Sequence, residues 1–248
     1  MAVQAFGNVD GIDAGRAIAP QLCALLRQRI IRNELPAGQK ISEAEIAMAY
    51  GISRQPAREA FIRLSGEGLV EVLPQRGTRI CRIGLAAVRE ARFIREAIEA
   101  DIVTLLAERP DVASVDRLRG LLDEQRHVPA DDPEAFMEAD ERFHRALAEA
   151  AGKAGTWARV EGLKAQMDRV RFLSVARFPM AALIDQHARI VDRIAEGDGA
   201  GAGRALRGHL REILRDLPHI VRDNPAVFAV PPDGDDDRIV TIQGGETP

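Results

Sequence analysis

The chain has 248 residues, of which 46% are hydrophobic, 4% aromatic and 29% charged. This composition favours helix over sheet, and the lack of any apolar run of about 18 residues excludes a transmembrane helix. The formal net charge of −4 divides into +2 for residues 1–80 and −6 for residues 81–248, a weak sign of a nucleic-acid-binding part joined to an acidic one.

The N-terminus and the cysteines both favour a cytoplasmic protein with no membrane partner. Residues 1–13 contain Asp10 and Asp13 and lack the basic segment and apolar core of a signal peptide. Cys23 and Cys81 lie in no metal-binding or redox spacing, so we expect two buried thiols in a reducing compartment.

After a patternless start over residues 1–15, two helices are predicted. Leu22, Leu26 and Ile30 recur at helical spacing within residues 19–33. A second helix begins at Ser42, because Glu45 three residues later completes a capping box, and Gly51 ends it.

A third helix follows directly, and its two faces differ. Ser53 is the expected N-cap, and the apolar face is formed by Ala57, Ala60, Phe61 and Leu64. Arg54 and Arg58 are four residues apart and therefore share another face near the start of the helix.

A short hairpin completes the first 80 residues. Residues 69–72 and 78–80 are predicted strands on either side of a basic turn over residues 74–77. Three helices and a small β-hairpin form a winged helix-turn-helix, predicted for residues 1–80.

The second helix of a helix-turn-helix presents its N-terminal residues to base edges in the major groove. Arg54 and Arg58 have the fork that binds guanine, and Gln55 has the amide that binds adenine. Side-chain hydroxyls are potential donors to phosphates, and the wing tip is basic. The predicted DNA-contacting residues are therefore Ser53, Arg54, Gln55, Arg58, Arg76, Gly77 and Thr78.

Residues 85–222 are helix-periodic nearly throughout and predict an all-α bundle of six to seven helices. The expected helices cover residues 85–108, 112–126, 132–151, 155–174, 180–196 and 200–221. Residues 223–248 contain Pro225, Pro231, Pro232 and an acidic run, and we expect a tail of which a part packs.

One constellation in the predicted bundle has the composition of a metal site. Asp140 and His144 are four residues apart on one helix face, and His187 and His209 lie on later helices. Three imidazoles and one carboxylate suit Zn, Ni, Mn, Fe or Co. Spacing alone leaves a simpler alternative open, in which these side chains form hydrogen bonds within the core.

Residues 18–80 resemble the DNA-binding domain of the GntR family of bacterial transcription regulators. The motifs that carry the resemblance are Ile41-Ser42-Glu43, Gly51-Ile52-Ser53-Arg54, Pro56, Arg58-Glu59-Ala60, Leu64, Glu67-Gly68-Leu69-Val70 and Arg76-Gly77. The resemblance implies operator contacts by Arg54 and Arg58 and a wing-tip contact by Arg76 and Gly77. Ala44 stands where some members carry a further arginine, and Gln55-Pro56-Ala57 replaces a more usual Thr-Pro-Val; both departures bear on operator sequence.

Residues 85–222 resemble the FCD effector-binding domain of the FadR-type subfamily. The similar segments are Arg95-Glu96-Ala97-Ile98-Glu99, Asp140-x-x-Phe143-His144, Ala150-Ala151-Gly152, a segment from His187 to Asp198, and His209-Leu210. Metal-binding members carry an Asp or Asn and three His in this order, which implies a metal at Asp140, His144, His187 and His209. Lys153 departs from the Asn that is usual after Ala-Gly.

Three arginines are candidates for binding an effector. Arg95 is the first choice for a carboxylate, because guanidinium offers a planar pair of donors; its alternative is an intrahelical pair with Glu99. Arg169 and Arg171 lie on a helix expected to line the cavity.

These observations predict a regulator and not an enzyme. It binds a palindromic operator as a homodimer, more often as a repressor, and a small carboxylate effector at a divalent transition metal controls its DNA affinity. One alternative makes the metal ion itself the effector. A remote alternative is a metal-dependent enzyme with a DNA-binding head, disfavoured because no nucleophile or second carboxylate pair adjoins the cluster.

Overall fold

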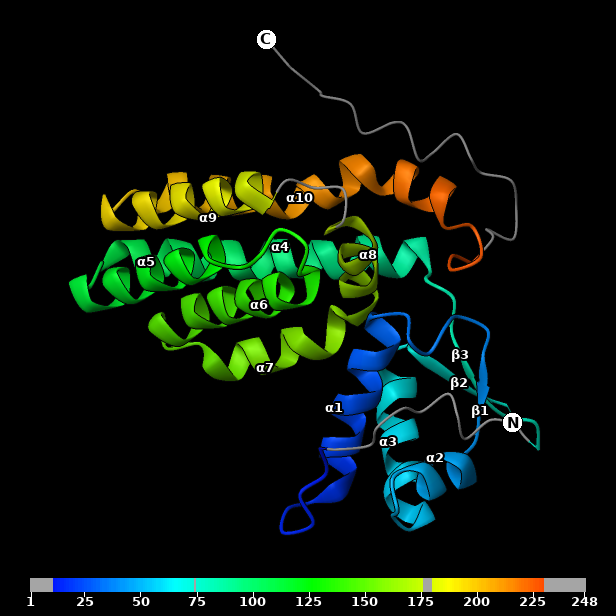
Figure 1. Ribbon diagram of the computed structural model, residues 1–248. Helices are drawn as coiled ribbons and strands as arrows, with labels where there is room; N and C mark the ends of the chain where they lie inside the picture. The colour runs from blue at the N-terminus through cyan, green and yellow to red at the C-terminus, as the bar shows by residue number, and fades with distance from the viewer. Residues whose placement is uncertain (1–10, 74, 176–179, 230–248) are drawn as a thin grey trace.

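The computed structural model describes residues 11–73, 75–175 and 180–229, apart from the side chains of Val175, Ile213 and Leu214. Pro74 of the predicted turn and residues 230–248 of the predicted tail lie outside the described residues. The described part is mainly helical and forms a small head below a larger helical body (Figure 1). None of its helices is both long and apolar enough to cross a bilayer.

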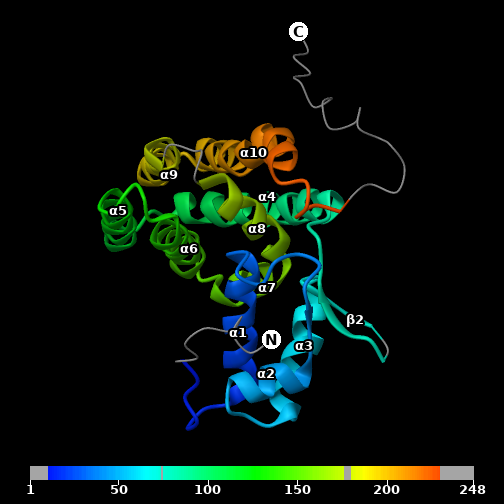
Figure 2. The ribbon, with the colours of Figure 1, turned by 45° about the vertical axis from the view of Figure 1, so that its right-hand side comes forward.

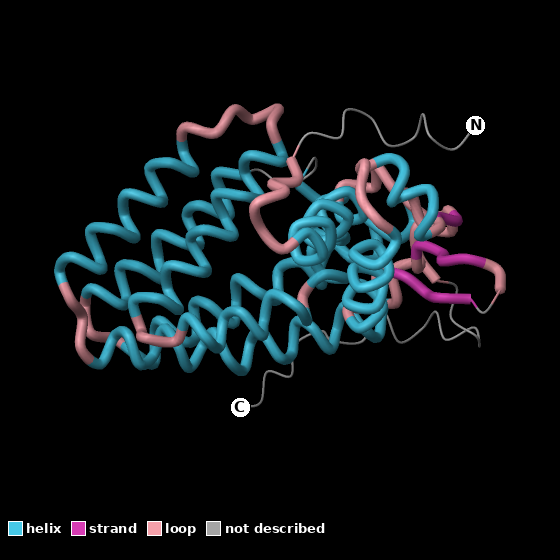
Figure 3. The backbone as a smooth tube through the Cα atoms, turned by 90° about the horizontal axis from the view of Figure 1, so that it is seen from below, coloured by secondary structure: helices cyan, strands magenta, loops and turns pink. Residues whose placement is uncertain are grey.

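The head contains the predicted winged helix-turn-helix and one strand more than predicted. Its elements are α1 (Ile18–Ile31), β1 (Lys40–Ile41), α2 (Glu43–Ala49), α3 (Arg54–Gly66), β2 (Val70–Leu73) and β3 (Gly77–Ile80). The sheet has the order β1-β3-β2 and is antiparallel, with Lys40 opposite Arg79 and Val72 opposite Thr78. The expected hairpin is therefore the larger part of a three-stranded sheet, gathered at one end of the molecule (Figure 3).

The two predicted helix caps in the head differ in the structure. The Ser42 hydroxyl accepts a hydrogen bond from the Glu45 backbone N–H at 3.2 Å and donates to the Glu45 carboxylate at 2.9 Å. Ser53 occupies the N-cap position of α3, but its side chain forms no capping hydrogen bond, so that part of the prediction is wrong. Gly51, at φ 61°, allows the tight turn between α2 and α3.

The body consists of α4 (Leu85–Glu108), α5 (Val112–Arg126), α6 (Pro133–Ala150), α7 (Ala154–Leu163), α8 (Ala165–Val175), α9 (Met180–Ala195) and α10 (Gly199–Asp223). In Figure 1, α9 and α10 lie along the top, α4, α5 and α6 lie below them, and α8 turns upward from α7. The long central helix α4 contacts α6, α8, α9 and α10. A hydrophobic core shared by α4, α5, α6, α7, α9 and α10 includes Val103, Phe143, Trp157, Ile190 and Leu206.

The single helix predicted over residues 155–174 is wrong, because the chain breaks at Lys164 into α7 and α8. Lys164 is buried, and its ammonium pairs with Glu141 of α6 at 2.7 Å and with Asp168 at 2.6 Å. These pairs hold the chain where it changes direction toward α4.

The predicted tail begins one residue too early and is ordered for a few residues beyond α10. The Ile83 backbone N–H donates to the Val227 carbonyl, and the Ala229 N–H donates to the Ile83 carbonyl, both at 2.9 Å. Residues 81–84 form the linker between β3 of the head and α4 of the body. Phe228 is buried between this linker and the body. The segment after α10 therefore covers the link between head and body.

Head and body contact each other through helices as well as through the linker. Figure 2 shows α1 standing beneath α7 and α8, and the contacts between α1 and α8 confirm this neighbourhood. Ala165, the first residue of α8, lies in the hydrophobic core of the head with Leu22, Phe61 and Leu69. The two cysteines are free, with Cys23 buried in this core and Cys81 partly buried.

Candidate metal centre and nucleic-acid interface

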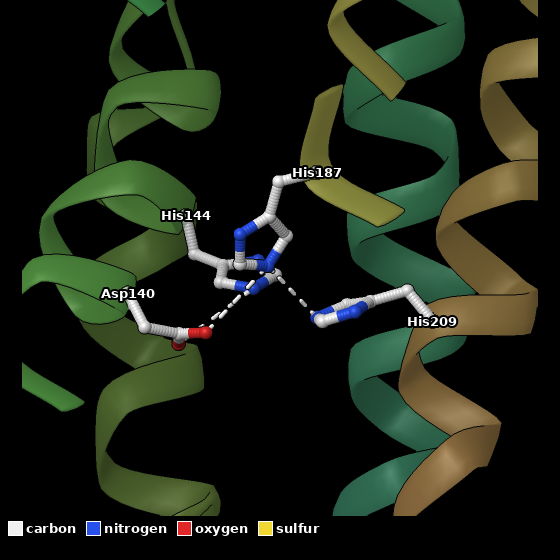
Figure 4. A group of neighbouring side chains, drawn as sticks. All are labelled: Asp140, His144, His187 and His209. Atoms are coloured by element: carbon white, nitrogen blue, oxygen red, sulfur yellow. Dashed lines mark hydrogen bonds and ion pairs between the residues drawn. The ribbon is translucent and has the colours of Figure 1, made fainter. Parts of the chain in front are cut away.

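The four predicted metal ligands converge in the centre of the body (Figure 4). Asp140 and His144 come from α6, His187 from α9 and His209 from α10. One ligand atom from each lies within 4.8 Å of the others, and no member is more than 8% exposed. The fold therefore brings together four side chains that are up to 69 residues apart in the chain.

A side-chain oxygen faces Nδ1 of each histidine. His144 Nδ1 lies 2.7 Å from Glu99 Oε2, His187 Nδ1 lies 2.9 Å from an oxygen of Gln125, and His209 Nδ1 lies 2.8 Å from an oxygen of Gln186; the three contacts share one pattern. These oxygens accept hydrogen bonds, so each Nδ1 carries the proton and each Nε2 has a free lone pair. Such outer partners orient metal-binding histidines.

The Nε2 lone pairs and the Asp140 carboxylate face one another without protons between them. His187 Nε2 lies 3.2 Å from His209 Nε2 and 3.5 Å from Asp140 Oδ1. Among the described residues, His144 Nε2 and Asp140 Oδ1 are buried without a hydrogen-bond partner, whereas Asp140 Oδ2 is paired with Arg171. A cation between these atoms would satisfy the opposed lone pairs, so the donor set fits a divalent transition metal.

The electrostatics keep the ligands in their metal-binding forms. Burial lowers the pKa of His187 to about 3 and lowers the pKa of His209 well below its usual value, so both imidazoles are neutral at pH 7. Burial opposes ionisation of Asp140, but Arg171 and the histidines outweigh it and hold the pKa of this carboxyl well below its usual range.

Arg95 adopts the intrahelical pair that the sequence left as its alternative. Its Nε–H donates to Glu99 Oε1 at 2.5 Å, while the other Glu99 oxygen accepts from His144. Burial raises the pKa of Glu99, but Arg95 and His144 outweigh this and lower the pKa to about 2. Arg95 therefore supports His144 through Glu99; its Nη1 retains a single weak contact, 4.0 Å from Met167 Sδ.

Arg169 and Arg171 lie on α8 but differ in what they contact. Arg171 Nη2 is 2.5 Å from Asp140 Oδ2, beside the cluster. Arg169 donates to the Cys81 carbonyl at 2.8 Å, so the structure places its guanidinium at the head and not at the cluster. We therefore remove Arg169 from the candidate effector-binding residues.

Sequence reasoning missed the two glutamines and the role of Glu99. Glu99 had a signal, since it lies four residues after Arg95 and was the alternative partner of that arginine. Gln125 and Gln186 had none, because a glutamine on a helix is usually solvated and only the packing of α5 and α9 brings these two to the cluster.

The predicted DNA-contacting residues form two exposed groups on the head. Arg54, Gln55 and Arg58 are exposed on the first turns of α3, where Gln55 Nε2 donates to Glu59 at 3.1 Å. Arg76 and Gly77 are exposed at the wing tip, and Ser53 is exposed at the start of α3.

Thr78 does not belong to this surface, because it is 4% exposed. Side chains alternate along β3, and Thr78 and Ile80 face inward while Arg79 faces outward. Its assignment as a phosphate donor is therefore corrected.

A winged helix-turn-helix with exposed arginines at the start of α3, joined to a helical body, is the architecture of a DNA-binding transcription regulator. Residues 19–80 match the model of the bacterial regulatory proteins of the gntR family, and residues 90–212 match the FCD domain. The chain belongs to the GntR family, in its FadR-type subfamily with an FCD domain, whose members are regulators and not enzymes.

Relatives of known sequence agree over nearly their whole length. An uncharacterized HTH-type transcriptional regulator in an unstable DNA locus of Streptomyces ambofaciens is 37% identical over 216 residues, which cover 87% of this chain and 91% of that one. The HTH-type transcriptional repressor RspR of Escherichia coli K12 is 34% identical over 84% of this chain and 92% of its own. The solved structure of E. coli McbR/YncC has the same fold, with a TM-score of 0.69 at 17% identity over 84% of this chain and 99% of that one.

Proposed function

We propose that this regulator binds a palindromic operator as a homodimer and represses transcription, and that a small organic acid bound at a metal in the Asp140–His cluster controls its DNA affinity. The observation that carries the proposal is the convergence of three unprotonated Nε2 atoms on Asp140, inside a domain joined to a DNA-binding head.

The charges around the cluster favour an anionic effector. Asp140 is paired with Arg171 and Glu99 with Arg95, so each of these two carboxylates already has a cationic partner before any ion binds. A divalent ion would leave two positive charges in a buried site, where electrostatic attraction is strong. When bound, such an ion acts as a Lewis acid that accepts carboxylate oxygens at positions the protein leaves free.

Two arginines near the cluster support the proposal of an anionic ligand. Arg171 lies beside Asp140 and lines a cavity of about 660 Å³ between α1, α6, α7 and α8. We infer that Arg171, with the fork geometry that suits carboxylates, is the main contact of the effector and that Arg95 is a secondary one.

The head supports the DNA-binding half of the proposal. Arg54, Gln55 and Arg58 are exposed on the helix that enters the major groove, and the wing tip with Arg76 adds a backbone or minor-groove contact. A dimer places two such helices about one DNA turn apart, which matches a palindrome. The related RspR bears the name of a repressor, which supports repression as the sign of regulation.

Metal analysis tests the site. Purified parent protein is expected to retain or take up a divalent ion, and His144→Ala with His187→Ala is expected to lose it by elemental analysis, while His127→Ala, on the exposed end of α5, keeps it. Equal metal content in the parent and the double variant would remove the site. Operator affinity that changes with the metal alone would make the ion itself the effector.

A further inference from the structure

Helix α8 lies between the metal cluster and the head and is buried on all sides over residues 165–170. Its first residue, Ala165, belongs to the head core, while Met167 and Val170 pack with Ile83 of the linker and Phe228. A helix that shares packing with both parts must shift its contacts in one when it moves against the other.

Two side chains of α8 hold the wing at both of its ends. Gln166 Nε2 donates to the Gly68 carbonyl, which precedes β2, at 2.5 Å. Arg169 Nη1 donates to the Cys81 carbonyl, which follows β3, at 2.8 Å. Hydrogen bonds from a single helix, α8, therefore connect both ends of the β2–β3 hairpin to the body.

The same helix is joined to the metal cluster by an ion pair, because Arg171 contacts Asp140, a candidate metal ligand, at 2.5 Å. Lys164, the residue before α8, contacts Glu141, the neighbour of Asp140 in the chain, at 2.7 Å. A cation that binds the Asp140 carboxylate competes with Arg171 for it, and an anion that binds Arg171 competes with Asp140.

The buried guanidinium of Arg169, which contacts the head through the Cys81 carbonyl, has few hydrogen-bond partners for a buried charge. Arg169 is 2% exposed, and among the described residues it has no carboxylate partner and its Nη2 has no hydrogen-bond partner. Burial lowers the pKa of this guanidinium to about 10. A buried charge stabilised chiefly by backbone oxygen is costly, so a small shift of α8 alters this contact.

We propose that α8 transmits the occupancy of the Asp140–His cluster to the wing, with Arg171 as the residue at the cluster and Gln166 and Arg169 as positioning residues for the head. This inference rests on the metal site of the proposed function and assigns the route by which that site reaches the DNA-binding domain. The coupling is reciprocal, as in any linkage between two sites.

Hydrogen exchange of the full-length protein with and without zinc ion alone tests the relay. In the parent, zinc is expected to slow exchange in the helices that carry the histidines, in α8, and at residues 68–72 and 78–83 of the head. The slowing at the head is expected to be at least about fivefold, the lower end of common allosteric coupling. In Gln166→Met with Arg169→Met, the slowing at the histidine helices is expected to persist and the slowing at the head to be lost.

Two controls separate the relay from loss of structure. Arg159→Met, on the exposed side of α7, removes an arginine that donates to the Gly155 carbonyl of its own helix, and this variant is expected to behave as the parent. Gln166→Met with Arg169→Lys retains a donor toward Cys81 and is expected to restore part of the response at the head.

The outcomes distinguish the relay from the metal site. Zinc that slows the histidine helices without affecting the head in the parent, or an equal response of the head in the double variant, would overturn the relay alone. No change at the histidine helices, with no zinc bound, would overturn the proposed metal site and the relay together.

Discussion

At the scale of single residues, the metal cluster depends on oxygens that are not themselves ligands. Glu99, Gln125 and Gln186 each hold one histidine by its Nδ1, and together they direct three Nε2 atoms to one point. Only Glu99 is charged, and Arg95 balances that charge. We therefore regard Glu99 as the outer partner with the largest influence on the site.

We expect Glu99→Gln to weaken metal binding by about 10-fold to 100-fold, because it keeps an acceptor for His144 but removes the charge that makes the imidazole a stronger donor. Competition with a chromophoric chelator measures the affinity. Glu90→Gln, a change on the exposed side of α4, is the matched control. An unchanged affinity for the Glu99 variant would show that this carboxylate does not tune the site.

The metal-free protein should lose stability as the pH falls below about 6.5. Burial lowers the pKa of His187 to about 3, so the unfolded chain takes up a proton on this residue from about pH 6.5 downward while the folded chain does not. Between pH 6.5 and pH 5, protonation of His187 in the unfolded chain lowers the free energy of unfolding by about 2 kcal/mol, at about 1.4 kcal/mol per pH unit.

Urea unfolding at pH 7 and pH 5 measures this loss. His187→Gln removes the titrating group, so its stability should fall by about 2 kcal/mol less than that of the parent over the same pH interval. An equal fall in the two proteins would show that His187 is not kept neutral by its burial.

At the scale of elements, the two helix starts in the head provide a matched comparison. Ser42 caps α2 through Glu45, whereas the Ser53 side chain forms no cap for α3. Ser42→Ala is expected to lower the free energy of unfolding by about 1 kcal/mol, and Ser53→Ala by less than about 0.5 kcal/mol. Thermal or denaturant unfolding of both variants checks this, and equal losses would mean that the two starts are stabilised alike.

The elements that sequence reasoning placed correctly are those with long periodic patterns or distinct caps, such as α4, α6 and α2. The break between α7 and α8 had no local signal, because Gly162-Leu163-Lys164 does not interrupt the helical pattern and the cause is the pairing of Lys164 with α6. Strand β1 is two residues long, too short for an alternating pattern, and is defined by its pairing with β3.

At the scale of the whole molecule, the sequence motifs and their resemblance to the GntR and FCD domains indicated both domains and the four candidate ligands. The placement of α8 was not predictable, and the roles of Arg169 and Arg171 followed from it. Both arginines are on one helix two residues apart, yet one contacts the Cys81 carbonyl of the head and the other contacts Asp140. Such a division arises from the tertiary packing of a helix whose residues 165–170 are all buried.

The central claim is that the head binds a specific DNA sequence through α3. Selection of genomic DNA fragments by the purified full-length protein, followed by sequencing, tests it because no operator sequence has to be chosen in advance. The parent and Arg63→Ala, a variant of an exposed arginine near the end of α3, are expected to enrich a palindrome with half-sites about one DNA turn apart. Arg54→Ala with Arg58→Ala is expected to enrich nothing while retaining its helical content; undiminished enrichment by that variant, or none by the parent, would contradict the claim.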